Sequence, residues 1–530
     1  MYDIIIINGT LLDGTGRKMF TGDIGIKDGV IRKMEYLRHE PAHQVLDAGG
    51  CFVTPGFIDI TNHSDTYWQL FAENGLESLV QQGITTIIGG NSGSSLAPFV
   101  DRNMLQTIQK WVDIGGLNLN WLSMREFLDE VERRHLPINF GTLVGHTTLR
   151  RGVLGDVNRP ITSDEIKILQ KMLHQSLNEG ALGVSFGLPY SHAREAKHPE
   201  LMALLEITKK AKGMCAIQLR DESDESIQSI EEAILLARSS GARMHISHLK
   251  ILSEKNWPLL KKALHLMETA ASSGVNISFD VYPYTSTASI LYTLLPDWVT
   301  QGCKKSMLTR LKDKKICQEA IQELQKNPLD YTKATLLSSS VNAMTCRQNI
   351  AEMAKQQQKT PEEILIDVLV AGDGRAIISL EALSEKNIER EIQHPLACVS
   401  SNGFGLSKRD VETGEATHPR NFGSFPRFLG RYVREKQLLG WEEAIRKITL
   451  QPAERLGLLK RGKLMEGNWA DIAIFDPERI IDMATIAHPY RYPSGIRWVI
   501  VNGEVVLADG TMTGERTGQV IRRKPLCWWQ

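Results

Sequence analysis

Four polar side chains follow a predicted strand at the point where it ends. Val53–Ile60 is an apolar run of the kind that forms a buried strand, and Thr61, Asn62, His63 and Asp65 come directly after it. In a barrel of parallel strands, the carboxyl ends of the strands carry the chemistry. An imidazole and a carboxylate at that edge can transfer protons or bind a metal, so His63 and Asp65 are candidate catalytic residues.

A serine and two bases form a second set of candidates. Ser92 lies between glycines in Gly90-Asn-Ser-Gly93, where backbone N–H groups can hold an oxyanion. A serine nucleophile needs an adjacent proton acceptor, which His248 or Lys250 would supply. The alternative is a turn without chemistry, because Gly, Asn and Ser are also the common residues of turns.

Strand-like runs alternate with helical periodicity through the middle of the chain. The candidate strands besides Val53–Ile60 are Thr85–Ile88, Asn139–Val144, Gly183–Phe186, Met214–Leu219, Arg243–His248, Asn276–Val281, Ala376–Ser379 and Ala397–Ser400. Helical periodicity covers Ser163–Asn178, Glu200–Ala211, Ser226–Ser239 and Leu259–Ser273. This alternation predicts an α/β fold with a (β/α)8 barrel. These candidates exceed the eight strands that a barrel takes, so at least one assignment has to be wrong.

The two ends of the chain predict a small β domain. Residues 1–54 and 460–530 consist largely of short apolar runs separated by turn sequences, which is the pattern of hairpins. Because both ends enclose the α/β region of residues 55–459, we expect one discontinuous β domain. Residues 286–345 interrupt the barrel pattern with Lys- and Gln-rich helical sequence, which indicates an insertion over one barrel mouth.

Several motifs resemble those of a known family. Pro55-Gly-Phe-Ile-Asp-Ile-Thr-Asn-His63 is similar to the Pro-Gly-Phe-Ile-Asp-x-His-x-His that opens the barrel of the amidohydrolase superfamily. Further motifs resemble the D-aminoacylases (N-acyl-D-amino-acid deacylases) along nearly the whole chain: Gln82-Gly-Ile-Thr-Thr86, Gly90-Asn-Ser-Gly-Ser-Ser-Leu-Ala-Pro98, Gly145-His-Thr-Thr-Leu-Arg150, Leu219-Arg-Asp-Glu222, Ile246-Ser-His-Leu-Lys250, Asp280-Val-Tyr-Pro-Tyr284, His418-Pro-Arg420, Gly423-Ser-Phe-Pro-Arg427, Gln451-Pro-Ala-Glu454 and Ala470-Asp-Ile-Ala-Ile-Phe-Asp-Pro477. The resemblance implies a TIM-like barrel, a β-sandwich domain from both termini, and a metal-dependent hydrolase of amide bonds.

This sequence departs from the family at four positions. Two histidines, a bridging cysteine and a catalytic aspartate of the family are replaced here by Thr61, Gln218, Ser92 and Asn402. His63 and His248 are the family ligands that remain. Hydroxyl and amide oxygens bind zinc weakly, and two imidazoles hold it less tightly than three or four ligands. We therefore expect no zinc cofactor, with a residual metal site at His63 and His248 as the alternative.

Side chains able to hold a carboxylate remain in the matched motifs. The resemblance implies that cationic or hydroxyl groups bind the carboxylate of an amino-acid moiety, and the candidates are Arg220, Lys250, Tyr282, Tyr284 and Arg420. Arginine suits this task because its planar guanidinium pairs with a carboxylate through two hydrogen bonds. The alternatives are a structural ion pair for Arg420 and packed strand ends for the tyrosines. We expect a small-molecule ligand with a carboxylate or an amide.

Composition argues against other classes of partner. The 62 Lys and Arg residues balance 62 Asp and Glu residues, so we expect no binding of nucleic acid or of an anionic membrane. No apolar stretch reaches about 18 residues and the first residues lack a signal-peptide pattern, which predicts a cytoplasmic protein.

Seven scattered cysteines argue against a disulfide framework. Trp528 and Trp529 suggest docking on a neighbouring chain or domain, so a homo-oligomer stays open.

Three functional hypotheses follow from these residues. The first is an enzyme acting on the C–N bond of a small N-acyl amino acid or cyclic amide without the family's zinc site. The second is a non-catalytic barrel that binds a similar ligand or a protein partner, because polar residues can reline a former metal pocket without new activity. The third is a conventional zinc-dependent deacylase with an unusual ligand set.

Overall fold

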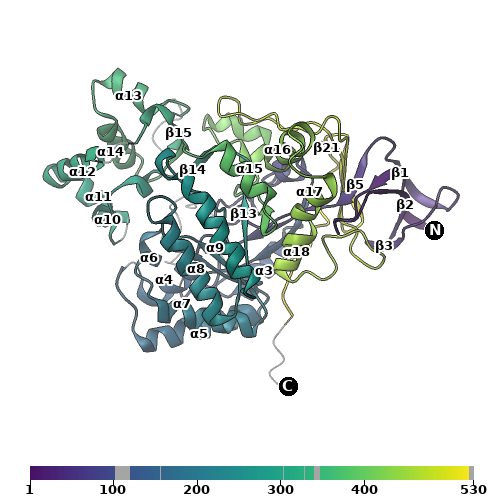
Figure 1. Ribbon diagram of the computed structural model, residues 1–530, viewed down its shortest axis with the longest axis horizontal. Coiled ribbons are helices and arrows are strands. Elements are labelled where there is room, and N and C mark those ends of the chain that lie inside the picture. Colours follow the sequence, from purple (N-terminus) through teal and green to yellow (C-terminus); the bar gives the residue numbers. More distant parts are fainter. Residues whose placement is uncertain (102–119, 156, 303, 327–328, 340–345, 525–530) are drawn as a thin grey trace.

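The computed structural model describes residues 1–101, 120–155, 157–302, 304–326, 329–339 and 346–524 of the 530-residue chain (Figure 1). Trp528 and Trp529, which were expected to dock on a neighbour, lie outside these residues. None of the described helices is both long and apolar enough to cross a membrane.

Eight parallel strand positions form the barrel. They are β6 (Phe57–Asp59), β7 (Ile84–Gly89), β8 (Asn139–Thr142) with its continuation β9 (Val144–Gly145), β10 (Gly183–Gly187), β11 (Met214–Gln218), β12 (Arg243–Ile246), β13 (Ile277–Val281) and β17 (Ala397–Val399). Neighbouring strands pair in the orders β6-β7-β8 and β9-β10-β11-β12-β13-β17. A parallel bridge between Asn62 and Gly403 joins the first and last strand ends. The predicted barrel is therefore confirmed.

Amphipathic helices cover the outside of the barrel (Figure 1). The helices that follow the strands include α3 (Met124–Arg133), α4 (His146–Leu154), α5 (Ser163–Asn178), α7 (His198–Lys210), α8 (Ser226–Ser240), α9 (Leu260–Ser272), α15 (Glu385–Gln393), α17 (Trp441–Ile448) and α18 (Leu450–Leu456). The helix at 163–178 begins with a capping box, in which the Thr162 hydroxyl accepts from the N–H of Glu165 while the Glu165 carboxylate accepts from that of Thr162. The four helices predicted from periodicity are confirmed.

The run Val53–Ile60 is not one strand. It divides at Gly56 into β5 (Phe52–Pro55), which pairs with the C-terminal strand β18 (Ile472–Phe475), and β6, which pairs with β7 in the barrel. A Cβ at Gly56 would lie 2.2 Å from the side chain of Thr85, so a larger residue would disturb this crossing point. The single apolar run therefore connects the two domains.

Both chain ends contribute to one sheet. Its nine strands are β1 (Tyr2–Leu11), β2 (Phe20–Lys27), β3 (Val30–Lys33), β4 (Ala42–Asp47), β5, β18, β19 (Ile496–Val501), β20 (Glu504–Ala508) and β21 (Thr511–Met512). The N-terminal strands lie to the right in Figure 1. Aliphatic side chains from both ends, including Ile6, Ile24 and Ile474, are fully buried together. The domain is thus held by apolar contacts between segments more than 400 residues apart.

The insertion differs from its prediction. It runs from β14 (Ser286–Ile290) to β16 (Ala376–Glu381), beyond residue 345, and contains an antiparallel sheet in the order β14-β16-β15, with β15 at Ala334–Ser339. The expected barrel strand Ala376–Ser379 is therefore wrong, because it is the central strand of this small sheet. An apolar run of that length has the same composition in parallel and antiparallel sheets.

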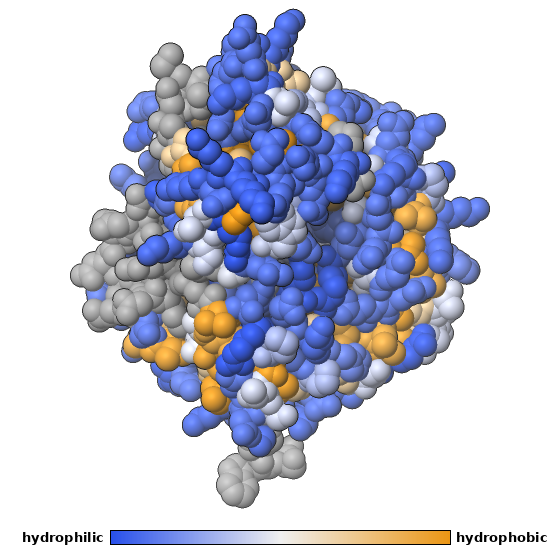
Figure 2. All heavy atoms as spheres, turned by 90° about the vertical axis from the view of Figure 1, so that its left-hand side faces the viewer, coloured by the Kyte–Doolittle hydropathy of each residue, from blue (hydrophilic) through white to orange (hydrophobic). Residues whose placement is uncertain are grey.

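Helices and apolar residues give the insertion a core of its own. Its helices are α10 (Asp297–Thr300), α11 (Lys304–Lys312), α12 (Lys314–Lys326), α13 (Ile350–Gln357) and α14 (Pro361–Ala371). Buried residues such as Leu336, Ile350 and Leu365 form a hydrophobic cluster separate from that of the barrel. Figure 2 shows that the outer face on this side of the molecule is mainly hydrophilic.

Candidate functional site

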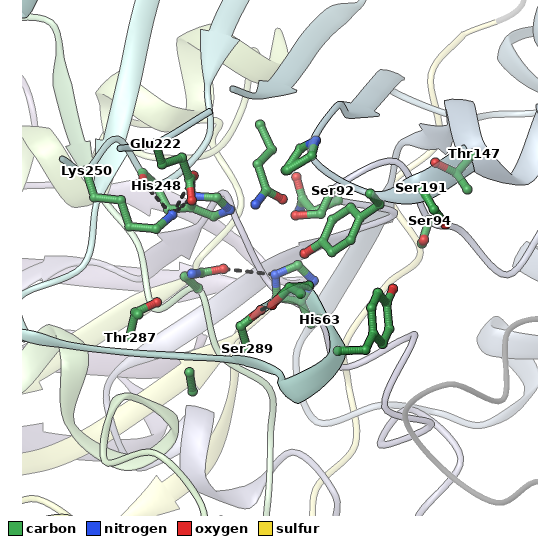
Figure 3. A pocket seen from close by; sticks show the side chains of 18 of the residues that line it. His63, Ser92, Ser94, Thr147, Ser191, Glu222, His248, Lys250, Thr287 and Ser289 are labelled. Atoms are coloured by element: carbon green, nitrogen blue, oxygen red, sulfur yellow. Dashed lines mark hydrogen bonds and ion pairs between the residues drawn. The ribbon is translucent and has the colours of Figure 1, made fainter. Parts of the chain in front are cut away.

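A cavity of about 320 Å³ lies at the carboxyl ends of the barrel strands. The last residue of β11 and the loops after β6, β7, β10, β12 and β17 contribute side chains to it, among them His63, Ser92, Tyr190, Gln218, His248 and Asn402. Residues of the insertion, including Thr287, Ser289 and Tyr292, form another wall. Figure 3 shows how several of these side chains converge on the same space.

Thr61 is fully buried and is not among the residues that line this cavity. Its hydroxyl donates to Oδ2 of Asp280 across 2.8 Å, and the His245 ring contacts the same oxygen at 2.8 Å. Burial alone would raise the pKa of Asp280, but the hydrogen bond and charge of His245 hold that pKa below its ordinary value. The Thr61 hydroxyl is therefore engaged by a fully buried carboxylate.

His63 and Asn402 contact each other across the cavity. The Nε2–H of His63 donates to Oδ1 of Asn402 over 2.9 Å. Burial lowers the pKa of His63 to about 4, so the ring is neutral near pH 7 and Nδ1 carries its lone pair. Asn402 stands where the family has an aspartate, and its amide oxygen orients the neutral ring of His63.

Lys250, Glu222 and His248 form a compact charged cluster. The Lys250 ammonium donates to Oε1 of Glu222 at 2.5 Å and to Nδ1 of His248 at 2.9 Å. Lys250 is 6% exposed, and burial lowers its pKa, while the Glu222 carboxylate opposes that effect. A cation therefore lies directly against the imidazole that the family uses as a ligand.

Ser92 lines the cavity without a base beside it. Within the described chain, its Oγ makes no hydrogen bond to His248 or Lys250, so the hypothesised pairing of Ser92 with either base is not assembled. Ser92, His248 and Asn402 all have left-handed backbone conformations, with φ of 51°, 40° and 45°. Such conformations are uncommon for residues other than glycine, although Asn and His adopt them more often than most, and they concentrate at functional sites.

Asp65 lies outside the cavity lining. Its Oδ2 accepts a hydrogen bond from the N–H of Gly90 across 2.6 Å, and its side chain is fully buried. A Cβ at Gly89 would lie 2.8 Å from the Asp65 carboxyl group. Asp65 therefore positions the loop that carries Ser92 rather than facing a ligand.

The candidate carboxylate-binding residues separate into different environments. Arg220 borders the cavity, but its guanidinium pairs with Glu232 through two hydrogen bonds of 3.1 and 2.8 Å. Arg420 borders the same cavity, is 7% exposed, and has no ion pair with a carboxylate among the described residues. Its Nε and Nη1 atoms are buried without a hydrogen-bond partner. Arg420 is thus available to an anionic ligand, whereas Arg220 is neutralised.

The two candidate tyrosines are not among the residues that line the cavity. The Tyr282 ring packs against Arg420, with the guanidinium carbon 5.4 Å from the ring centre. Tyr284 donates to Oδ2 of Asp482 at 3.2 Å, away from the cavity lining. Tyr282 therefore supports Arg420, and Tyr284 joins the barrel to the C-terminal segment.

Other cavity residues were missed by the sequence analysis. They are Tyr67, Thr147, Arg151, Tyr190, Arg194 and Tyr292. Tyr190 and Thr147 follow the strands β10 and β9 closely, which is the same signal that identified His63. Tyr292 lies in the insertion, and its contact with the barrel carries no sequence signal.

The donor set does not fit the zinc pair of the family. Thr61 is engaged by Asp280, and Ser92, Gln218 and Asn402 offer neutral oxygens. The Lys250 ammonium occupies one side of His248. No group of three or more His, Cys, Asp or Glu side chains is arranged to hold a metal in the part of the chain that the structure describes.

Comparison with known proteins shows which proteins this chain is similar to. The chain is 32% identical over 522 residues to N-acyl-D-aspartate deacylase from Alcaligenes xylosoxydans xylosoxydans, in a match that covers 98% of this chain and 95% of the relative. It is 29% identical over 522 residues to D-aminoacylase from the same organism, in a match that covers 98% of each chain. The N-acyl-D-glutamate deacylase of Bordetella bronchiseptica, solved with zinc and a phosphonate inhibitor, is similar with a TM-score of 0.84 and 29% identity over 98% of this chain and 99% of that one. Because the sequence profile of the amidohydrolase family matches residues 44–334 and 416–507, the chain belongs to that family.

Proposed function

We propose that this protein acts on the amide bond of a small N-acyl amino acid without the zinc pair of its relatives. The observation that carries this proposal is the Arg420 guanidinium, which is buried, borders the cavity and lacks a carboxylate partner among the described residues. An unpaired buried charge is costly, so a ligand carboxylate would stabilise it. The deacylases that the chain resembles have names that specify such carboxylate-bearing amides.

The other cavity groups suit attack on an amide carbonyl. The Lys250 ammonium can stabilise negative charge on the carbonyl oxygen. The oxygen of a water molecule forms a bond to the carbonyl carbon while its proton goes to Nδ1 of His63, whose Nε2–H is held by Asn402. The C–N bond then breaks, and this proton passes to the leaving amine.

A ligand-binding protein without catalysis is the second candidate. A pKa of about 4 makes His63 a weak base, and Asn402 cannot accept a proton as the family's aspartate does. Both facts favour slow or absent turnover, while they leave ligand binding by Arg420 intact. Binding alone would therefore be the outcome if no amine is released.

The test compares a carboxylate with its amide. The purified protein is incubated with both enantiomers of N-acetylalanine and of N-acetylalaninamide, with binding measured by calorimetry and amine release measured by fluorescence labelling. We expect tighter binding of the carboxylate and amine release that a chelator leaves unchanged. Equal affinity for carboxylate and amide would contradict the anchoring role of Arg420. Near-stoichiometric zinc with chelator-sensitive activity would instead support a deacylase with recruited ligands.

A further inference from the structure

A fully buried carboxylate is bonded to chain neighbours of both His63 and Asn402. Asp59 is the last residue of β6, its side chain is fully buried, and it is not among the residues that line the cavity. The dashed line at His63 in Figure 3 marks the hydrogen bond from His63 to Asn402, on which the proposed chemistry depends. Because Asp59 does not reach the ligand, any role it has in the site is exercised through other residues.

Asp59 binds the residue that precedes Asn402. The N–H of Ser401 donates to Oδ1 of Asp59 across 2.8 Å, and the Ser401 hydroxyl donates to Oδ2. The same hydroxyl accepts from the N–H of Gly403 at 2.9 Å. Both chain neighbours of Asn402 are thus fixed, one directly and the other through Ser401. Bonds of this kind allow the uncommon left-handed conformation of Asn402, with its φ of 45°, to persist.

Asp59 also binds the residue that precedes His63. Its Oδ2 accepts from Nδ2 of Asn62 at 2.8 Å, and Oδ1 of Asn62 in turn accepts from the N–H of Ser64 at 2.9 Å. The His63 N–H donates to the carbonyl of Gly403 across 2.8 Å, so the two backbone segments are also bonded to each other. One carboxylate therefore joins the segment that carries the imidazole to the segment that carries its amide partner.

Three donor groups converge on Asp59, and an ionised carboxylate can satisfy all of them. A carboxylate accepts at both oxygens, whereas an amide of the same shape accepts at its oxygen and donates from its nitrogen. Burial raises the pKa of Asp59 to about 7, and the hydrogen bonds from Ser401 and Asn62 oppose this effect. Above that pH the side chain is ionised and accepts from all three groups.

We propose that Asp59 is a positioning residue that fixes the tautomer of His63. By holding Ser401 and Asn62, it keeps the amide oxygen of Asn402 against Nε2, so the proton stays on Nε2 and the lone pair stays on Nδ1. The proposal rests on the proposed function, because that function gives Nδ1 the role of accepting a proton from water. An imidazole with its proton on Nδ1 has no lone pair at that atom to do so.

NMR of the protein labelled with 15N-histidine tests the proposal at pH 8.5, where Asp59 is ionised and His63 is neutral. A ring nitrogen gives different signals with and without a proton, and the signals of His63 are those that His63→Gln lacks. We expect the Nε2–H tautomer alone in the unaltered protein and a mixture of both tautomers in Asp59→Asn. Whichever way the new amide is turned, its NH2 group faces the N–H donor of Ser401 or of Asn62.

A second variant and a matched control accompany this change. Ser401→Ala removes the hydroxyl and keeps the N–H bond to Asp59, so a smaller share of the Nδ1–H tautomer is expected. The control is Asp23→Asn in the small β domain, because Asp23 is 3% exposed and likewise accepts two backbone N–H bonds, of 3.2 and 2.9 Å. It should lower the midpoint of thermal unfolding, as Asp59→Asn does, but leave His63 entirely in the Nε2–H form.

The outcomes separate this inference from the proposed function. A single Nε2–H tautomer in the folded Asp59→Asn and Ser401→Ala variants, a mixture in Asp23→Asn, or an Nδ1–H tautomer in the unaltered protein would each overturn the positioning role. Ser401→Ala decides alone if Asp59→Asn does not fold. If the tautomers respond as expected but no amine is released by any form of the protein, the proposed reaction fails while the positioning of His63 stands. Where amine is released, Asp59→Asn should slow the release about tenfold and change the affinity for N-acetylalanine less than threefold.

Discussion

Lys250 donates an N–H to Nδ1 of His248 across 2.9 Å, so a protonated amine faces the ring nitrogen of a neighbouring base. This arrangement disfavours protonation of His248, because the nitrogen that would take a proton already accepts one hydrogen bond. Burial and the Lys250 charge both lower the pKa of His248. The Glu222 carboxylate balances the cluster, at 2.5 Å from the ammonium and 3.4 Å from the imidazole.

Removing that carboxylate should destabilise the fold. In Glu222→Gln the buried ammonium loses its counter-charge, and the free energy of unfolding should fall by about 3 kcal/mol. Urea denaturation at pH 7 measures the change. The control is Glu232→Gln, which breaks the more exposed pair with Arg220 and should cost about 1 kcal/mol or less. Equal losses in both variants would contradict a buried, interdependent cluster.

Arg420 should decide ligand affinity. Arg420→Gln should weaken the binding of N-acetylalanine about 100-fold, because a bidentate, charge-assisted pair is lost. Arg420→Lys keeps the charge and should recover part of the affinity. Arg220→Gln is the matched control, since that guanidinium is already paired with Glu232, and should change the affinity less than threefold. Calorimetry with folded variants would reject the assignment if Arg220 and Arg420 behaved alike.

Restoring the family residues should create zinc binding. The combined variant Thr61→His, Ser92→Cys, Gln218→His and Asn402→Asp adds two imidazoles, a thiolate and a carboxylate around His63 and His248. Elemental analysis after dialysis should find about one or more zinc ions per chain, and much less in the unaltered protein. A folded variant that takes up no zinc would show that the motifs are misplaced at these positions.

His63 should make the fold sensitive to acid. Its pKa is about 4 in the folded state and 6.5 ordinarily, so the unfolded chain binds the proton more tightly. The associated stability is complete above pH 6.5 and is lost as the pH falls towards 4, by up to about 3 kcal/mol. Unfolding free energies at pH 7 and 4.5 should differ less in His63→Gln than in the unaltered protein. The exposed His39→Gln should leave this difference as it is.

The spacing of apolar residues in the sequence predicts most of the fold. The helices at 163–178 and 226–240 were predicted almost to the residue, because amphipathic spacing and caps are local signals. Ala376–Ser379 was misassigned because an apolar run does not reveal its partner strands. The division of Val53–Ile60 into two strands was missed for the same reason. Gly56 is needed where the chain passes from one sheet to the other because Thr85 lies against it, and that contact cannot be read from the sequence.

The site was only partly predictable. Motifs located His63, His248, Lys250 and Arg420, which all border the cavity. They also suggested Arg220 and Tyr284, whose partners Glu232 and Asp482 lie 12 and 198 residues away and carry no motif signal. A side chain's type shows what it can bind, but its availability depends on which groups the fold has already placed beside it. The catalytic roles of His63, Ser92 and Asn402 remain predictions.

The chain enters the insertion and leaves it at the same place. Ser286 pairs with Glu381 in the small sheet, and the N–H groups of Ala382 and Leu383 both donate to the carbonyl of Thr285. The insertion has its own hydrophobic core and is connected to the barrel by two neighbouring stretches of chain, while polar contacts such as the Arg194–Asp297 ion pair and the hydrogen bond from Ser338 to Glu415 add to this connection. Such an insertion can be exchanged as a unit, in evolution or by design. The exchange would change which ligands reach the cavity while the barrel residues of the site keep their positions.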